Sequence, residues 1–179
     1  MGIVNTPPAS DSPETNPARP GPLAPSAWYR IFHRVIANFY FNRISLLHSE
    51  RIPDSGPVLY LGLHRNGAVD GFVYNAVLRR CVYLVSTQLL RGLLARLFFT
   101  GIPVSRSKDK IRTDTSESLL SGRDLLLAGG RLFVFPEGTS DLGPRHLPFK
   151  SGAARILADF LETGRPVTVV PLAIAYESP

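Results

Sequence analysis

The sequence has little cysteine and no long hydrophobic run. Cys81 is the single cysteine among 179 residues, which excludes an internal disulfide framework and favours a reducing compartment. Because Cys81 opens an apolar run, we expect a buried, inert thiol rather than a nucleophile. No segment reaches the roughly 18 uncharged apolar residues of a membrane span, and no charged-then-apolar leader is found. We therefore expect a cytoplasmic protein, either soluble or peripheral on the cytoplasmic face of a membrane.

Several signatures of known chemistries are missing as well. The sequence contains no P-loop and no dinucleotide fingerprint, and its four histidines do not cluster with metal-ligand spacing. No serine lies in a GxSxG elbow, which argues against a hydrolase. We therefore expect neither a cofactor nor a metal.

Lysine is scarce, so arginine supplies most of the positive charge. The formal net charge is +6 and the isoelectric point is about 9.9. This charge favours partners that carry phosphate, whether lipid headgroups, coenzyme A or nucleic acid, and does not select among them. Hydrophobic residues at 44% and charged residues at 19% are typical of a globular protein, and the length suits one domain.

Two different segments open the chain. Residues 1–25 contain seven prolines, and such a segment cannot bury enough apolar surface to offset its ordering entropy, so we expect a disordered tail before one domain over residues 26–179. Residues 26–40 then carry apolar side chains at helical spacing. One interpretation is an amphipathic helix that lies on an anionic membrane; the other is a helix packed against the domain's own sheet. The apolar stripe comprises Trp28, Ile31, Phe32, Val35, Ile36, Phe39 and Tyr40.

The most informative stretch is residues 58–72. Residues 58–63 form an apolar run suited to a buried strand, and His64 follows where open α/β sheets bind their ligands. An imidazole can take a proton from a hydroxyl near neutral pH, and a carboxylate on its other nitrogen orients it. We interpret His64 as a catalytic base and Asp70 as its orienting acid. The alternative is a capping or core histidine beside an unrelated aspartate.

The remaining pattern alternates apolar runs with helical segments, which predicts an α/β fold with helices about a mixed, largely parallel sheet. Residues 132–135 form a further strand that delivers Glu137, Gly138 and Thr139 to the same sheet edge as His64. Pro171 within the last apolar run favours an edge strand or a bulge. Further strands are expected over residues 82–85 and 167–176, and helices over residues 71–80, 89–99, 114–130 and 151–164.

Four of these blocks occur together in one order. The histidine–aspartate loop is followed by FPEGTS at residues 135–140, LPFKSGA at residues 147–153 and VPLAIAY at residues 170–176. In this order the blocks resemble the glycerolipid acyltransferases, the 1-acylglycerol-3-phosphate acyltransferase family. The resemblance covers roughly residues 60–176.

The resemblance implies an enzyme of phospholipid biosynthesis. It would move a fatty acyl chain from an acyl thioester, on coenzyme A or acyl carrier protein, to a hydroxyl of a lysophospholipid such as 1-acylglycerol-3-phosphate. In that family the histidine acts as the base and the aspartate assists it, without an acyl-enzyme, a metal or a redox cofactor. The implied partners are a membrane surface, the lysophospholipid and the thioester donor, with no nucleic acid.

The resemblance also implies an acceptor site. Arg106, which follows the GIPV segment, matches the arginine that contacts the acceptor's phosphate in the family. Glu137, Gly138 and Thr139 match the block that binds the glycerol phosphate. The family often has arginine where this chain has Ser140, so Arg145 or Lys150 would supply that charge.

Two features depart from the family pattern. Five residues separate His64 from Asp70 instead of four, and on a helix the extra residue would turn Asp70 by about a further 100°. Gly67 could absorb this residue because glycine tolerates positive φ. The chain also stops soon after its last expected strand, whereas relatives usually continue, which suggests a truncated domain. The alternative function is therefore a noncatalytic membrane- or lipid-binding module.

Overall fold

The computed structural model describes residues 27–78, 80–87, 101–104, 115–141 and 145–177. Three expectations fall outside this part of the chain: the tail over residues 1–25, the helix over residues 89–99 and the position of Arg106.

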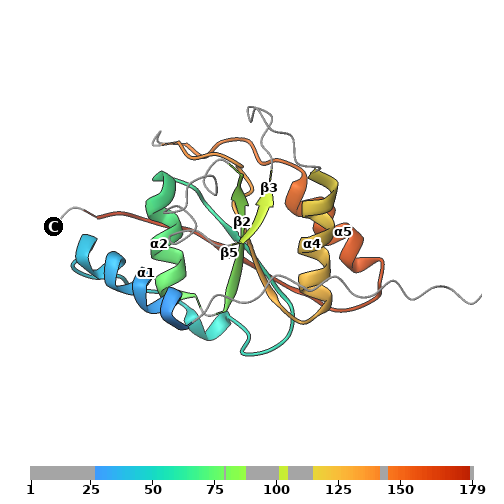
Figure 1. Ribbon diagram of the computed structural model, residues 1–179, viewed down its shortest axis with the longest axis horizontal. Coiled ribbons are helices and arrows are strands. Elements are labelled where there is room, and N and C mark those ends of the chain that lie inside the picture. Colours follow the sequence, from blue (N-terminus) through green and yellow to red (C-terminus); the bar gives the residue numbers. More distant parts are fainter. Residues whose placement is uncertain (1–26, 79, 88–100, 105–114, 142–144, 178–179) are drawn as a thin grey trace, which may run out of the picture.

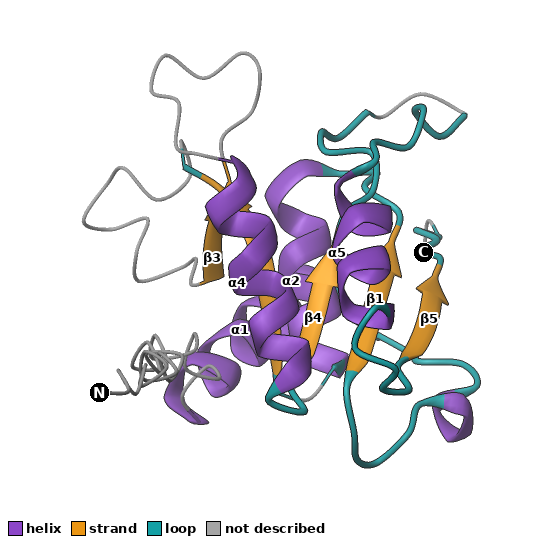
Figure 2. Cartoon of the chain, turned by 90° about the vertical axis from the view of Figure 1, so that its right-hand side faces the viewer, coloured by secondary structure: helices purple, strands orange, loops and turns teal. Residues whose placement is uncertain are grey.

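The described residues form one sheet between two layers of helices (Figure 1). The strand order is β3-β2-β4-β1-β5, and every pairing is parallel. The α/β prediction is confirmed, but the expected mixed sheet is fully parallel in this part of the chain, and its strands run in one direction (Figure 2). The strands are β1 Val58–Gly62, β2 Cys81–Ser86, β3 Gly101–Val104, β4 Arg131–Val134 and β5 Thr168–Leu172.

Helices cover both faces of the sheet. One face is covered by the pair α1 and α2, the other by the pair α4 and α5 (Figure 1). A short 3-10 turn, η1, precedes β1. The bounds are α1 Ala27–Tyr40, η1 Ser49–Arg51, α2 Gly67–Val77, α4 Thr115–Leu127 and α5 Gly152–Leu161.

The central strands are apolar on both sides because both of their faces are buried. In β1, Val58 and Tyr60 join the cluster beneath α2, while Leu59 joins the cluster beneath α4 and α5. Ile156 and Phe160 of α5 are fully buried in the second cluster, as their helical spacing predicts. This alternation fixes β1 inside the sheet, between β4 and β5, and with it the start of the loop that follows.

Two predictions from single residues are confirmed. Pro171 lies in β5, the edge strand of the described sheet, where a missing N–H is tolerated. Cys81 is buried in the core, and this burial raises the pKa of its thiol, so the thiol is unsuited to act as a nucleophile near neutral pH. The last strand is shorter than expected, because β5 ends at Leu172 and residues 173–177 leave the sheet.

Helix α1 packs through the side opposite its apolar stripe. His33 and Ala37 are buried, and the ring of His33 lies 5.0 Å from that of Phe72 on α2. Helix α1 makes its main described contacts with α2, and the two helices lie on the same face of the sheet (Figure 1). Much of the stripe faces outward, with Trp28, Ile31, Val35 and Phe39 exposed by 70%, 55%, 61% and 92%.

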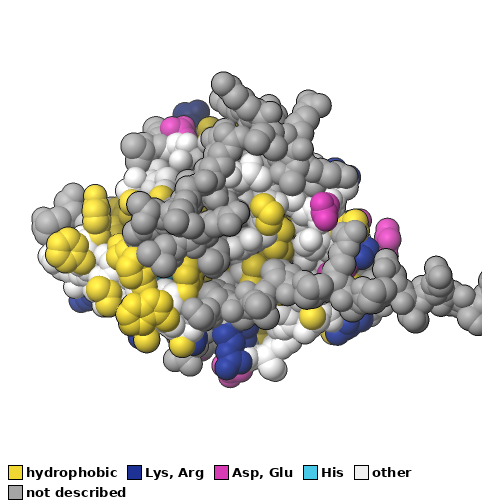
Figure 3. Space-filling model, viewed as in Figure 1, with side chains coloured by type: hydrophobic (Ala, Val, Ile, Leu, Met, Phe, Trp, Pro, Cys, Tyr) yellow, Lys and Arg dark blue, Asp and Glu magenta, His cyan; other side chains and the backbone are white. Residues whose placement is uncertain are grey.

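The outward stripe forms an apolar patch on the α1 side of the molecule (Figure 3). We call Trp28, Ile31, Val35 and Phe39 the α1 patch. Contiguous exposed apolar side chains of this kind are typical of an interaction surface. None of the helices in the described part of the chain is long and apolar enough to cross a membrane.

Candidate active site

His64 lies directly beyond β1, at the carboxyl end of the parallel sheet. Its side chain is almost buried, with the residue 8% exposed. The imidazole stacks on Phe135, which follows β4, at a centroid distance of 4.0 Å and an interplanar angle of 20°. The imidazole therefore lies between the ends of the neighbouring strands β1 and β4, with one ring face against Phe135.

Asp70 lies in the first turns of α2 and is completely buried. Its Oδ2 accepts a hydrogen bond from Nδ1 of His64 at 2.9 Å. The same oxygen accepts the backbone N–H groups of Arg65 at 2.6 Å and Asn66 at 2.7 Å. The other oxygen, Oδ1, accepts the hydroxyl of Tyr176.

These hydrogen bonds keep Asp70 ionised. Burial alone raises the pKa of Asp70, but hydrogen bonds from His64, Tyr176 and the backbone of Asn66 outweigh it and hold the pKa below its usual value. An ionised carboxylate can only accept, so Nδ1 of His64 carries the proton of this hydrogen bond. The tautomer that results leaves Nε2 of His64 able to accept a proton.

The unusual spacing does not separate the pair. His64 precedes α2 and only Asp70 is helical, so the rotation expected for two residues on one helix does not apply. Helix α2 begins at Gly67, earlier than expected, and Gly67 has φ +49°. Gly67 thus has the positive φ that glycine is expected to tolerate at this position.

The FPEGTS loop lies against the histidine loop. The N–H of Asp141 donates to the carbonyl of His64 at 3.4 Å. If Gly67 carried a side chain, its Cβ would lie 3.8 Å from Oγ of Ser140, so the two loops are close together. The N–H of Lys150 donates to the carbonyl of Pro136 at 2.8 Å, which joins the LPFKSGA block to the same place. Blocks far apart in the sequence thus meet at one sheet edge.

Glu137 is buried beside this edge with an unsatisfied oxygen. The residue is 2% exposed, and no described residue forms a hydrogen bond with its Oε1. A buried carboxylate oxygen without a donor is costly, so this position suits a hydroxyl of a substrate or a side chain from outside the described residues.

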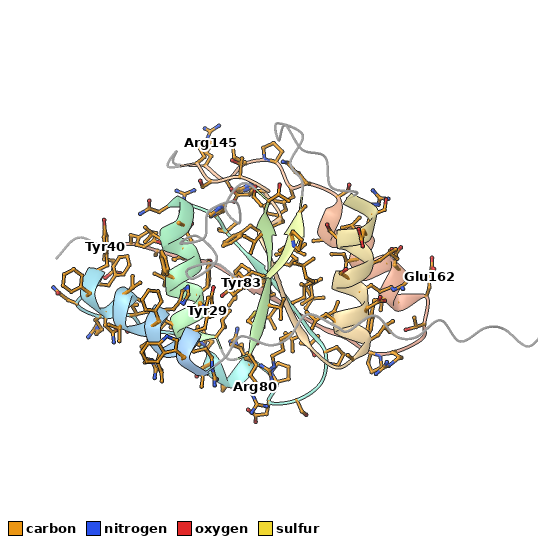
Figure 4. All side chains as sticks on the ribbon, in the orientation of Figure 1. Tyr29, Tyr40, Arg80, Tyr83, Arg145 and Glu162 are labelled. Atoms are coloured by element: carbon orange, nitrogen blue, oxygen red, sulfur yellow. The ribbon has the colours of Figure 1, made fainter. Side chains whose placement is uncertain are left out.

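Gly138 makes room for Lys150. Gly138 has φ +67°, and a Cβ there would lie 2.9 Å from both Cδ and Nζ of Lys150. The ammonium group of Lys150 thus lies over the glycine backbone, while Thr139 next to it is exposed. Arg145 is exposed at the same end of the molecule (Figure 4).

The structure therefore brings together His64, Asp70, Glu137, Gly138 and Lys150, while Arg106 lies outside the described residues. Across those described residues, no group of three or more His, Cys, Asp and Glu side chains could hold a metal ion.

Sequence reasoning missed Tyr176 as a site residue. It ends the VPLAIAY block, but its spacing from Asp70 gives no hint of contact, because 106 residues separate the two. Beyond β5 the chain leaves the sheet and brings Tyr176 across the end of β1 to Asp70. Only the parallel pairing of β5 with β1 could have indicated this proximity.

A histidine held by a buried carboxylate, beside a loop with an unsatisfied Glu, defines a site suited to general-base chemistry on a hydroxyl. The model of the Acyltransferase family matches residues 43–175 of this chain. The chain therefore belongs to the Acyltransferase family, which confirms its resemblance to the glycerolipid acyltransferases. No curated protein matches the chain.

Proposed function

We propose that this acyltransferase transfers a fatty acyl chain from an acyl thioester to a hydroxyl of a lysophospholipid such as 1-acylglycerol-3-phosphate. The donor would be carried by coenzyme A or acyl carrier protein. The observation that carries the proposal is the hydrogen bond between His64 and buried Asp70 at the carboxyl end of the sheet, in a chain of this family.

His64 would act as the general base. Nε2 removes the proton as the acceptor oxygen bonds to the thioester carbonyl carbon. The tetrahedral intermediate then collapses, the carbon–sulfur bond breaks, and the imidazolium returns the proton to the departing thiolate. The Asp70 carboxylate stabilises the imidazolium and fixes its orientation.

The FPEGTS loop would hold the acceptor. Oε1 of Glu137 is placed to accept a hydrogen bond from a glycerol hydroxyl, which would satisfy its unpaired oxygen. Lys150 lies against Gly138 and offers a positive charge for the phosphate. In this proposal Thr139 and Arg106 complete the acceptor site.

An apolar groove beside Tyr176 would receive a fatty acyl chain. It runs between α2 and the segments that follow α1 and β5, and Tyr176 lines it while contacting Asp70. The groove therefore approaches the His64–Asp70 pair from one side. Its apolar lining includes Phe41, Ile44, Leu46, Val73, Val77, Leu172 and Ile174.

The α1 patch would hold the enzyme on the membrane that contains its acceptor. Its exposed Trp28 and Phe39 suit the boundary between headgroups and acyl chains, and the exposed Arg34 and Arg43 suit anionic lipids. The apolar groove begins at Phe41, directly after α1. Docking through α1 would therefore place the groove next to the lipid surface on the cytoplasmic side.

The test is thiol release from a long-chain acyl-coenzyme A by the purified chain on anionic vesicles, with and without lysophosphatidic acid. We expect release that requires the acceptor and falls about 10²- to 10⁴-fold in His64→Ala, because a general base is removed. The matched control is His48→Asn, an exposed histidine before β1 whose positive φ asparagine tolerates.

Full activity of folded His64→Ala would refute the mechanism. Vesicle binding by the wild-type chain without any release, from either donor, would instead favour a noncatalytic lipid-binding module.

A further inference from the structure

The two oxygens of Asp70 are held by different parts of the chain. Oδ2 accepts three hydrogen bonds from residues 64–66, all close in sequence. Oδ1 accepts its hydrogen bond from Tyr176, which comes from the segment beyond β5. The histidine loop thus orients one oxygen, and a distant segment orients the other.

The hydroxyl of Tyr176 donates a hydrogen bond to this carboxylate. Burial, the hydrogen bond to Asp70 and the negative charge of Asp70 all raise the pKa of Tyr176. The hydroxyl therefore keeps its proton throughout the neutral range. Because an ionised carboxylate can only accept hydrogen bonds, Tyr176 is the donor in this one. Although 39% of Tyr176 is exposed, its hydroxyl contacts an aspartate that is fully buried.

Packing fixes the tyrosine ring. The ring of Phe41, the residue after α1, stacks on Tyr176 with a centroid distance of 5.6 Å and an angle of 23°. Tyr176 is thus held between the end of α1 and Asp70 of α2, so its hydroxyl is in place before any substrate binds.

Other polar groups near Asp70 do not replace this contact. The hydroxyl of Tyr74 on α2 donates to the carbonyls of Leu63 at 3.3 Å and Leu172 at 3.5 Å. Asp70 and Glu137 both act on Tyr74 through their charge. Besides Tyr176, the groups that bond Asp70 within the described residues are His64 and the two backbone amides.

We propose that Tyr176 is a positioning residue for the His64–Asp70 pair. It fixes the plane of the carboxylate so that Oδ2 faces Nδ1 of His64. The terminal torsion of an aspartate is broad and roughly two-fold, so a donor on the second oxygen restricts it further than the donors to Oδ2 do alone. The catalytic consequence rests on the proposed function, whereas the geometric one does not.

Tyr176→Phe removes this donor and keeps the ring, so the groove keeps its shape. Oδ1 is then left buried without its donor, and the affinity of the aspartate–histidine pair for protons rises. We expect kcat to fall about tenfold, with KM for both substrates within about twofold. The acidic limb of the pH profile should move to higher pH by roughly half a unit or more.

The decisive readout does not need activity. The imidazole of His64, assigned by comparison with His64→Ala, is titrated by NMR in the wild-type chain and in the variants. Tyr176→Phe should raise the titration midpoint, and Phe41→Leu, which loosens the ring stack but keeps the hydroxyl, should raise it less. Tyr60→Phe is the matched control, since its buried hydroxyl bonds Arg131 at 3.0 Å at the opposite end of the sheet.

The outcomes separate the two proposals. A shifted His64 midpoint in folded Tyr176→Phe, with the Tyr60→Phe midpoint unchanged, supports the positioning role even if the wild-type chain transfers no acyl group and the proposed function fails. An unchanged midpoint overturns the positioning role, as does an active enzyme whose kcat is the same in Tyr176→Phe.

Discussion

Asp70 combines two tasks, and replacing it by asparagine separates them. The carboxylate accepts the backbone amides of Arg65 and Asn66, which holds the loop, and it accepts Nδ1 of His64, which would stabilise an imidazolium. In Asp70→Asn the amide oxygen can take the Oδ2 position and its three donors. The amide NH₂ then faces Tyr176, whose hydroxyl can turn to accept it.

The expected magnitudes differ for folding and for catalysis. Asp70→Asn keeps every polar group paired, so we expect a loss of about 1–2 kcal/mol in the free energy of unfolding. Asparagine lacks the negative charge that would stabilise the imidazolium, so kcat should fall about 10- to 10³-fold. Asp70→Ala leaves four donors without their acceptor, and we expect it to lose at least about 3 kcal/mol.

The pH dependence has a defined sign. The pKa of Asp70 is lowered in the folded protein, so its contribution to stability is present above the unfolded value of about 4 and is lost as the pH falls through the folded value. Urea unfolding of the wild-type chain at several pH values from about 6 down to about 3, which spans the unfolded value, should show this loss. Asp70→Asn should be less sensitive to pH in that range.

Thiol release and urea unfolding of the same samples check both expectations. Folded Asp70→Asn with activity within about threefold of the wild-type chain would refute a role for the charge, and Asp70 would then be only a structural cap of the loop. A large loss of stability with activity retained at low temperature would point the same way.

Two further predictions concern the acceptor loop and the α1 patch. Gly138→Ala should destabilise the chain by about 1–2 kcal/mol and raise KM for lysophosphatidic acid more than for the donor, because the new methyl displaces Lys150. The control for backbone strain is Gly129→Ala, since Gly129 has φ +78° but a Cβ there would have nothing within 4 Å. Equal KM values in both variants would contradict the reasoning. Combined Trp28→Ser and Phe39→Ser should weaken binding to anionic vesicles at least about tenfold in a sedimentation assay without unfolding the chain. Leu161 is an exposed apolar residue of α5, and Leu161→Ser should have little effect on this binding. Unchanged binding of the double variant would exclude docking through α1.

The parts of the fold with strong local patterns could be predicted from the sequence. The apolar run at β1 predicts a buried strand, and the spacing of Ile156 and Phe160 predicts a helix with one buried face. The order of the strands in the sheet could not be predicted, because an apolar run indicates burial on both faces but not which strand lies beside it. For the same reason the stripe on α1 could be recognised but its orientation could not, and the helix packs through His33 and Ala37 instead.

Some residues of the site could be predicted from the sequence and others could not. His64 could be inferred because it follows a buried strand directly, and the family blocks indicated the FPEGTS loop. Tyr176 could not be inferred, because its contact with Asp70 depends on where the chain goes after β5 ends.

The spacing of His64 and Asp70 illustrates a limit of counting residues. A helical wheel assumes that both side chains lie on one helix, but His64 lies before α2 and the position of Asp70 is set by where α2 begins. The amides of Arg65 and Asn66 draw the loop onto Oδ2, so the histidine next to them reaches the same oxygen. Gly67 lies between the two partners at positive φ, where the chain turns into α2. The bonds to the carboxylate, rather than the number of residues between the two side chains, therefore define the pair, and a motif search that requires four intervening residues would overlook chains like this one.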